Sequence, residues 1–207
     1  MESQMAYHSI SEKLRIFASR AFIIGIVIIL LISESYWGKY ELIDTALFAA
    51  GCFLASIAAL GRMWCALYIA GYKNNTLITA GPYSISRNPL YFFSLIGALG
   101  VGLASETLLI PAVVLIFFLL YYPGVIRGEE KRLAKAHGEC FEAYCKKVPS
   151  FFPKFSLFQE PDTYVVNPKV FKRSIYSALW FIWLIAILEI IETLHETGIL
   201  RVHFKIY

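Results

Sequence analysis

The sequence has little charge and no basic run. Only 16% of its 207 residues are charged, and the formal net charge is +4 at pH 7. The positive residues are not gathered into a run with interleaved aromatic side chains, which is the pattern that single-stranded nucleic acid requires. We therefore expect no nucleic-acid partner.

The sequence also lacks the cysteine and histidine spacings that are typical of zinc sites. Its four cysteines are Cys52, Cys65, Cys140 and Cys145, and they include no C-x-x-C pair. Cys52 lies inside an apolar run, where a small hydrophobic residue is ordinary. We expect four free thiols, as in a reducing cytosolic environment, and no bound metal.

Hydrophobic residues, in contrast, are abundant. They make up 58% of the chain, whereas soluble domains have about 45–50%. A membrane-spanning helix needs about 17–25 mostly apolar residues. Five stretches come close to that length: Leu14–Ile32, Leu42–Leu60, Leu90–Ala104, Leu108–Tyr122 and Ile175–Leu194. The first resembles a secretory signal, but no small-x-small cleavage site follows it cleanly. The composition predicts an all-α integral membrane bundle of about five transmembrane helices.

The basic residues predict how this bundle is oriented. On a five-helix topology, 16 of the 19 lysines and arginines fall on the side of the N-terminus. Lys39, Arg201 and Lys205 fall on the other side. Because basic residues favour the cytoplasmic side, we expect the N-terminus inside and Tyr207 outside. No internal repeat divides the chain, so we expect a single domain over residues 1–207.

The stretch "GPYSISRNPLYFF" interrupts the apolar pattern with turn residues. Asparagine is favoured at a helix N-cap and proline at the first helical position, so Asn88 and Pro89 predict the start of the third span. Arg87 stands beside this helix N-terminus, where a carboxylate or phosphate can bind. An alternative is that Arg87 contacts lipid phosphate, while Tyr83 and Tyr91 belong to an interfacial aromatic belt.

The stretch "GEEKRLAKAHGECFEAYCKKVPSFFP" predicts one amphipathic helix that continues the fourth span. Its less polar face, at helical spacing, comprises Glu129, Leu133, Ala136, Cys140, Phe141 and Tyr144. At the membrane edge, the Glu129 carboxylate is suited to an ammonium or sulfonium group, whereas we expect Glu130 to be a solvated charge.

Together these two stretches resemble the isoprenylcysteine carboxyl methyltransferases and the related phospholipid methyltransferases. The likeness covers residues 62–153, with residues 1–60 and 175–194 as flanking membrane segments. It rests on ordered elements at Leu77, Gly81, Tyr83, Arg87–Tyr91, Glu129–Glu130, Gly138–Glu139, Tyr144, Val148–Pro149 and Pro153.

The resemblance implies a membrane enzyme that binds S-adenosylmethionine in a pocket on its cytoplasmic face, closed by the segment after the paired glutamates. By that resemblance, the cofactor contacts are Thr76, Leu77, Ile78, Tyr83, Asn88, Pro89, Leu90, Tyr91 and Glu129, with Tyr144 over the pocket. The catalytic candidates are Arg87, Arg127 and Glu129.

Two positions depart from the prenylcysteine enzymes. Asn88 replaces a histidine, and Val125 stands where those enzymes have a substrate-binding arginine, four residues before Glu129. Arg127 lies nearly on the opposite helix face. It compensates only if the helix unwinds near Gly124 or Gly128, where glycine makes a break less costly.

These features predict methyl transfer to a lipophilic acceptor that enters from the bilayer, with membrane lipids as the other partners. An isoprenylcysteine-like or other lipid-linked carboxylate is the first expectation, and a phospholipid or other lipid amine is the alternative. Two alternatives from another functional class stay open: a small transporter, and a lipid-binding membrane protein without catalysis. The sequence does not distinguish a bacterial inner membrane from the endoplasmic reticulum, and it does not give the oligomeric state.

Overall fold

A computed structural model describes residues 24–29, 31, 33–35, 41–70, 72, 76–200 and 204–206. Its long helices are α2 (Glu41–Ile69), α4 (Pro89–Leu103), α5 (Leu109–His137) and α7 (Pro168–Glu196). Its short elements are α3 (Pro82–Ile85), α6 (Glu139–Lys147), the 3-10 turn η2 (Phe155–Leu157), and the strands β1 (Ser33–Ser35) and β2 (Phe204–Ile206). Residues 24–29 are also helical. The two strands form one short parallel pair.

Three described helices, α2, α5 and α7, are long and apolar enough to cross a membrane. Each has 29 residues, about 43 Å of helix, against a hydrocarbon core of about 30 Å. Large apolar side chains on the outside of α5, among them Leu115, Ile116, Leu119 and Leu120, are exposed where lipid would contact them. The predicted helical membrane bundle is confirmed.

Four of the five expected spans correspond to α2, α4, α5 and α7, and α4 is the short one. The expected span Leu14–Ile32 lies mostly outside the described residues. The α4–α5 pair is a helical hairpin, as predicted, and it turns through residues 104–108. The orientation of the bundle in the membrane stays a prediction.

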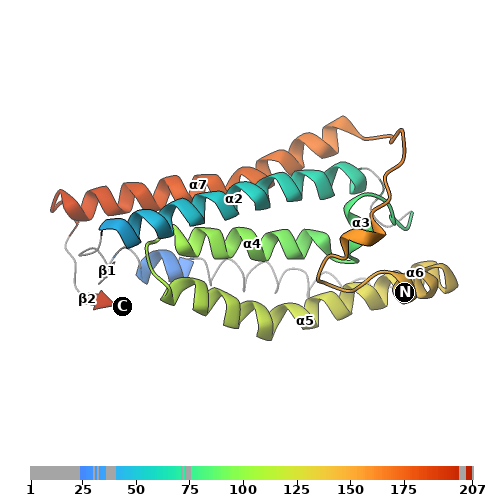
Figure 1. The fold of residues 1–207 in the computed structure, drawn as a ribbon, viewed down its shortest axis with the longest axis horizontal. Helices are drawn as coiled ribbons and strands as arrows, with labels where there is room; N and C mark the ends of the chain where they lie inside the picture. Colours follow the sequence, from blue (N-terminus) through green and yellow to red (C-terminus); the bar gives the residue numbers. More distant parts are fainter. Residues whose placement is uncertain are drawn as a thin grey trace, which may run out of the picture.

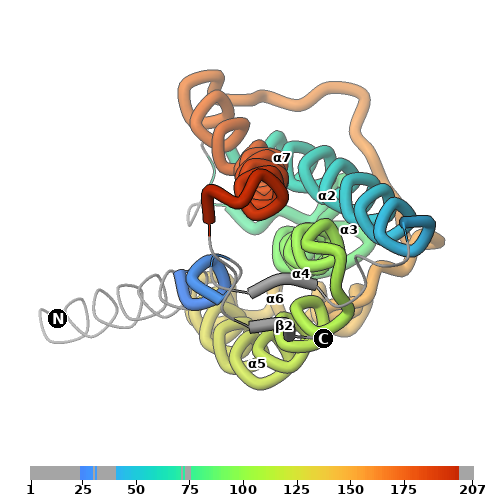
Figure 2. Tube along the Cα trace, turned by 90° about the vertical axis from the view of Figure 1, so that its left-hand side faces the viewer, coloured from blue at the N-terminus to red at the C-terminus, as the bar shows by residue number. Residues whose placement is uncertain are grey.

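Helix α4 lies at the centre of the bundle and contacts α2, α5 and α7 (Figure 2). It comes closest to α2 where two glycines face each other. A Cβ atom on Gly100 would lie 2.7 Å from the Ala55 nitrogen and 2.8 Å from the Gly51 oxygen. Small residues allow two membrane helices to approach closely and gain van der Waals contact. This contact fixes α4 against α2.

The expected single amphipathic helix after the fourth span is wrong, because Gly138 divides it. Helix α5 continues without interruption to His137, and α6 begins at Glu139. Gly138 has φ +50°, a backbone conformation that favours glycine. The break lets α6 take its own direction beside α3, at the end of the bundle where α4 begins and α5 ends (Figure 1).

Candidate active site

The site is built around the first residues of α4. Asn88 occupies the N-cap position and Pro89 the first turn, as predicted. The Asn88 side chain, however, does not cap the helix. Its amide donates to Glu130 Oε1 at 3.0 Å and to the Ser150 carbonyl oxygen at 2.9 Å. The residue is only 7% exposed, so this amide connects the start of α4 to α5 and to the segment after α6.

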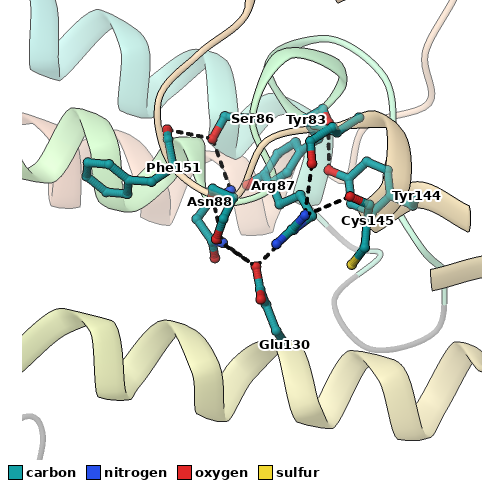
Figure 3. A network of polar contacts seen from close by, with 10 residues as sticks. Tyr83, Ser86, Arg87, Asn88, Glu130, Tyr144, Cys145 and Phe151 are labelled. Carbon is teal, nitrogen blue, oxygen red and sulfur yellow. Dashed lines mark hydrogen bonds and ion pairs between the residues drawn. The ribbon is translucent and has the colours of Figure 1, made fainter. Parts of the chain in front are cut away.

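Glu130 is the centre of this polar network (Figure 3). Its Oε1 atom accepts from Arg87 Nε at 2.9 Å, from the Asn88 amide at 3.0 Å and from Ser150 Oγ at 3.0 Å. The expectation that Glu130 is a solvated surface charge is therefore wrong. A partly buried carboxylate is stable here because an arginine and two hydrogen-bond donors compensate its charge.

Arg87 uses its guanidinium on neighbouring parts of the protein. Besides the ion pair with Glu130, its Nη1 atom donates to the carbonyl oxygens of Cys145, at 3.0 Å, and Val148, at 2.9 Å. These carbonyls lie at the C-terminal end of α6, where a cation also interacts favourably with the helix dipole. Arg87 thus positions α6, and its catalytic role stays a prediction.

The segment after α6 returns over the α3–α4 turn, and we call residues 148–160 the strap. Backbone bonds join it to the turn: Arg87 N–H donates to the Pro149 oxygen, and Lys154 N–H to the Ile85 oxygen, both at 2.9 Å. Ser86 Oγ donates to the Phe151 oxygen, also at 2.9 Å. The polar residues that interrupt the apolar pattern between α2 and α4 therefore hold the strap in place.

Tyr144 joins α6 to α3. Its hydroxyl donates to the Tyr83 carbonyl oxygen at 2.6 Å, and its ring packs in a small core with Phe141, Val148 and Leu77. Burial raises the pKa of Tyr144, so the hydroxyl stays protonated and can donate. Tyr144 thus brings two predicted cofactor contacts, Leu77 and Tyr83, next to α6.

Glu129 lies on a different side of the site from Glu130. Its Oε2 atom accepts from the Tyr91 hydroxyl at 2.7 Å, and its Oε1 atom from Arg132 Nη2 at 3.0 Å. The Glu129 side chain remains 27% exposed. Burial, followed by Cys65, Tyr144 and Glu129, raises the pKa of Tyr83, so its hydroxyl stays protonated. A partly exposed carboxylate beside the Tyr91 ring fits a small cationic group.

An apolar cavity of about 160 Å³ opens between α4, α5, α7 and residues 24–29. Tyr122 is one of the residues that line it. The Tyr122 ring stacks on Phe118 with centroids 4.1 Å apart and meets the Tyr91 ring edge-on at 5.5 Å. Because Tyr91 in turn bonds Glu129, a ring contact and a hydrogen bond connect the lining of the cavity to that carboxylate.

The remaining predicted residues differ in placement. Pro89 is buried, Ile78 and Leu90 are half-buried, and Thr76 is exposed. Arg127 is exposed, and no described residue forms a hydrogen bond or ion pair with it. Helix α5 stays helical throughout, so the unwinding near Gly124 or Gly128 that would bring Arg127 round does not occur. Arg127 therefore does not supply the guanidinium that is absent at Val125.

Sequence reasoning missed three residues: Glu130, Ser150 and Arg62. For Ser150 the sequence held no signal, and Glu130, although it is one of the paired glutamates of the resemblance, bonds residues far away in the chain that no local pattern pairs with it. Arg62 did have one, since a charge inside an apolar helix is unusual and indicates a functional site. The four cysteines are free, as predicted. Within the part of the chain that the structure describes, no group of three or more histidine, cysteine or acidic residues could hold a metal ion.

Comparisons with known proteins agree with this architecture. A model of the phospholipid methyltransferase family matches residues 42–140. The chain is 41% identical over 188 residues to the cobalt-zinc-cadmium resistance protein CzcN of Cupriavidus metallidurans, covering 90% of this chain and 86% of that protein. It is 37% identical over 171 residues to the nickel-cobalt-cadmium resistance protein NccN of Alcaligenes xylosoxydans xylosoxydans, covering 82% and 79% respectively.

The chain belongs to the phospholipid methyltransferase family, one of the membrane methyltransferases related to the isoprenylcysteine carboxyl methyltransferases. Enzymes of this family in general use S-adenosylmethionine. No solved structure matches the chain.

Proposed function

We propose that this protein transfers a methyl group from S-adenosylmethionine to a lipid-soluble acceptor. The observation that carries the proposal is the connection between the apolar cavity and the Glu129 carboxylate, through the contacting rings of Tyr122 and Tyr91. The cavity suits the hydrocarbon part of an acceptor that enters from the bilayer. The polar end suits the water-soluble cofactor.

The residues around Glu129 fit this cofactor. S-adenosylmethionine supplies an activated methyl group on a positively charged sulfur, and it also carries an ammonium group and a carboxylate. Glu129, with the faces of Tyr83 and Tyr91 nearby, would hold the positive groups. The N-terminus of α4 provides the positive end of a helix dipole for the carboxylate. Arg87 would act by keeping α6 and the strap over this site.

The protein's part in such a transfer is to align the two reactants and exclude water. A carboxylate acceptor is already ionised at neutral pH and needs no base. We therefore place a lipid-linked carboxylate first. A lipid amine is the second candidate, because the matching family is named for phospholipid methylation. An amine has to lose a proton first, and Glu129 is the carboxylate at this position that could accept it.

The names of the two relatives suggest a biological setting. Both are named for resistance to divalent metals, cobalt and cadmium among them. We propose that methylation of a membrane component is this chain's contribution to a similar resistance system. A strain that lacks the protein should become metal-sensitive, and the Glu129→Gln variant should not restore resistance.

The direct test incubates membranes that contain the protein with methyl-labelled S-adenosylmethionine and follows the label into lipid and protein fractions. We expect label with wild type and little label with Glu129→Gln. The control is Glu142→Gln, which removes an exposed carboxylate on α6. Mild base then releases methanol from a methyl ester and leaves a methylamine intact. Base-stable label would exclude the carboxylate acceptor, and the absence of label in every fraction would overturn the proposal.

A further inference from the structure

Arg62 is a positively charged residue inside a membrane-spanning helix, and the site described above does not account for it. It lies seven residues before the end of α2. Nη1 donates to Ser94 Oγ on α4, and Nη2 to Ser177 Oγ on α7 at 3.0 Å. Its guanidinium carbon also lies 5.7 Å from the centre of the Phe181 ring. The side chain therefore points into the bundle, between three helices.

The charge of Arg62 has no acidic partner among the described residues. Two serine hydroxyls and an aromatic ring are its neighbours, and its Nε atom is buried without a hydrogen bond to any of them. A guanidinium has five N–H donors, so most of its capacity is unused. Arg62 is half-buried, and a charge removed from water is costly unless an opposite charge compensates it. This arrangement calls for an anion that the described chain does not supply.

The apolar cavity leads to this guanidinium. Ser94 and Phe181, which both contact Arg62, line the cavity together with Tyr122. From Ser94 the cavity follows α4 to Gly102, which is eight residues or about 12 Å of helix. A hydrocarbon chain that fills this length would bring its polar end to Ser94, within reach of Arg62.

Arg62 and the candidate cofactor site are also close to each other. Arg62 donates to Ser94 on α4, and Tyr91, three residues or about one turn earlier on the same helix, donates to Glu129. Next to the cavity lining there is thus a cation on α2, bonded to Ser94, and the Glu129 carboxylate on α5, bonded to Tyr91. An acceptor anion held on one side would face a cationic methyl donor held on the other.

We propose that Arg62 binds the anionic group of the lipid-soluble acceptor and so determines which acceptors are methylated. This inference rests on the proposed function. It also gives the protein a guanidinium in place of the arginine that is absent at Val125, from a different helix. With a carboxylate acceptor, the carboxylate oxygen forms the bond to the methyl carbon as the carbon–sulfur bond breaks. The sulfonium becomes a neutral thioether, and no proton is transferred.

The same guanidinium chemistry suits two acceptors, a lipid-linked carboxylate and the phosphate of a phospholipid. The first would be methylated on the group that Arg62 holds. The second would be held by its phosphate while its amine is methylated. The test therefore uses three probes in detergent micelles: an S-prenylated N-acetylcysteine, its uncharged carboxamide, and phosphatidylethanolamine.

Binding is measured without cofactor, by the change in tryptophan fluorescence, since Trp180 lines the cavity. We expect wild type to bind the carboxylate at least about tenfold more tightly than the carboxamide, as a charge-assisted hydrogen bond implies. Arg62→Gln should remove that preference, and Arg62→Lys should keep part of it. The control is Arg173→Gln, an exposed charge on α7, which should behave as wild type.

If Arg62→Gln instead weakens only phosphatidylethanolamine, the anion that Arg62 binds is a phosphate. If wild type binds all three probes without preference, or if Arg62→Gln keeps every wild-type affinity, the role of Arg62 is overturned. The affinities of wild type for the carboxylate and the carboxamide test the proposal even if Arg62→Gln does not fold. If wild type shows the preference but neither binds S-adenosylmethionine nor transfers label, the proposed function fails and the anion site remains.

Discussion

The Nε atom of Arg87 lies 2.9 Å from Oε1 of Glu130, and this ion pair joins the residue before α4's cap to the C-terminal third of α5. Both side chains are mostly buried, and Arg87 also holds the last carbonyls of α6. One pair of charges therefore sets the relative positions of three helices around the candidate site.

Replacing Glu130 by Gln should destabilise the protein clearly. The change removes the charge that compensates Arg87 and weakens the bonds from Asn88 and Ser150. We expect a loss of about 1.5–3 kcal/mol, the range for a hydrogen bond to a charged group. Thermal unfolding in detergent measures it, with Glu142→Gln as the exposed control. Equal melting temperatures of Glu130→Gln and wild type would show that the network is not stabilising.

Tyr144→Phe tests whether Tyr144 does more than fill the core of α6. The variant keeps the ring and loses only the hydrogen bond to the Tyr83 oxygen. We expect a loss of about 1 kcal/mol in stability, together with weaker binding of S-adenosylmethionine because α3 loses its support. If stability and cofactor affinity are both unchanged, Tyr144 is simple core packing.

Gly100→Ala should disturb the contact between α4 and α2. The added methyl group would lie 2.7 Å from the Ala55 nitrogen and 2.8 Å from the Gly51 oxygen, which are backbone atoms, so the helices must move apart. The control is Gly124→Ala on α5, where nothing lies within 4 Å of the new methyl group. At position 124 the higher helix propensity of alanine should raise the free energy of unfolding by up to about 1 kcal/mol. Equal melting temperatures for the two variants would contradict the close packing.

Stability should also depend on pH through Glu106, which lies in the α4–α5 turn. Burial, the hydrogen bond that protonated Glu106 donates to Glu192, and the nearby charges of Glu192, Asp44 and Glu189 raise the pKa of Glu106 from 4.5 to about 8. Between these two values the folded protein binds more protons than the unfolded chain, so the free energy of unfolding falls as the pH rises. Melting temperatures measured from pH 5 to pH 8 should therefore decrease.

The matched variant is Glu106→Gln, which keeps a hydrogen-bonding side chain and loses the titration. Its melting temperature should vary less over the same pH range. A wild-type melting temperature that is constant from pH 5 to pH 8 would show that Glu106 does not hold its proton.

The sequence predicts the helices better than the site. Apolar run length and the Asn88–Pro89 start located α4, α5 and α7 because these signals are local. The helix break at Gly138 was missed, because the amphipathic pattern runs across it and only the backbone angle reveals it.

The polar contacts are long-range, and the sequence could not pair them. Glu130 looked solvated because its partners, Arg87 and Ser150, lie 43 and 20 residues away. Arg62 lies 115 residues from Ser177, and only the packing of α2 against α7 brings them together. The family resemblance places both Tyr91 and Glu129 among the cofactor contacts, and the structure joins these two side chains at 2.7 Å.

The central claim is that the site around Glu129 binds S-adenosylmethionine, and calorimetric titration of the detergent-purified protein tests it most directly. We predict saturable one-site binding by wild type, unchanged binding by Glu142→Gln, and at least about tenfold weaker binding by Glu129→Gln, because a charge-assisted contact is lost. Absence of binding by wild type, or equal affinity of wild type and Glu129→Gln, would contradict the account.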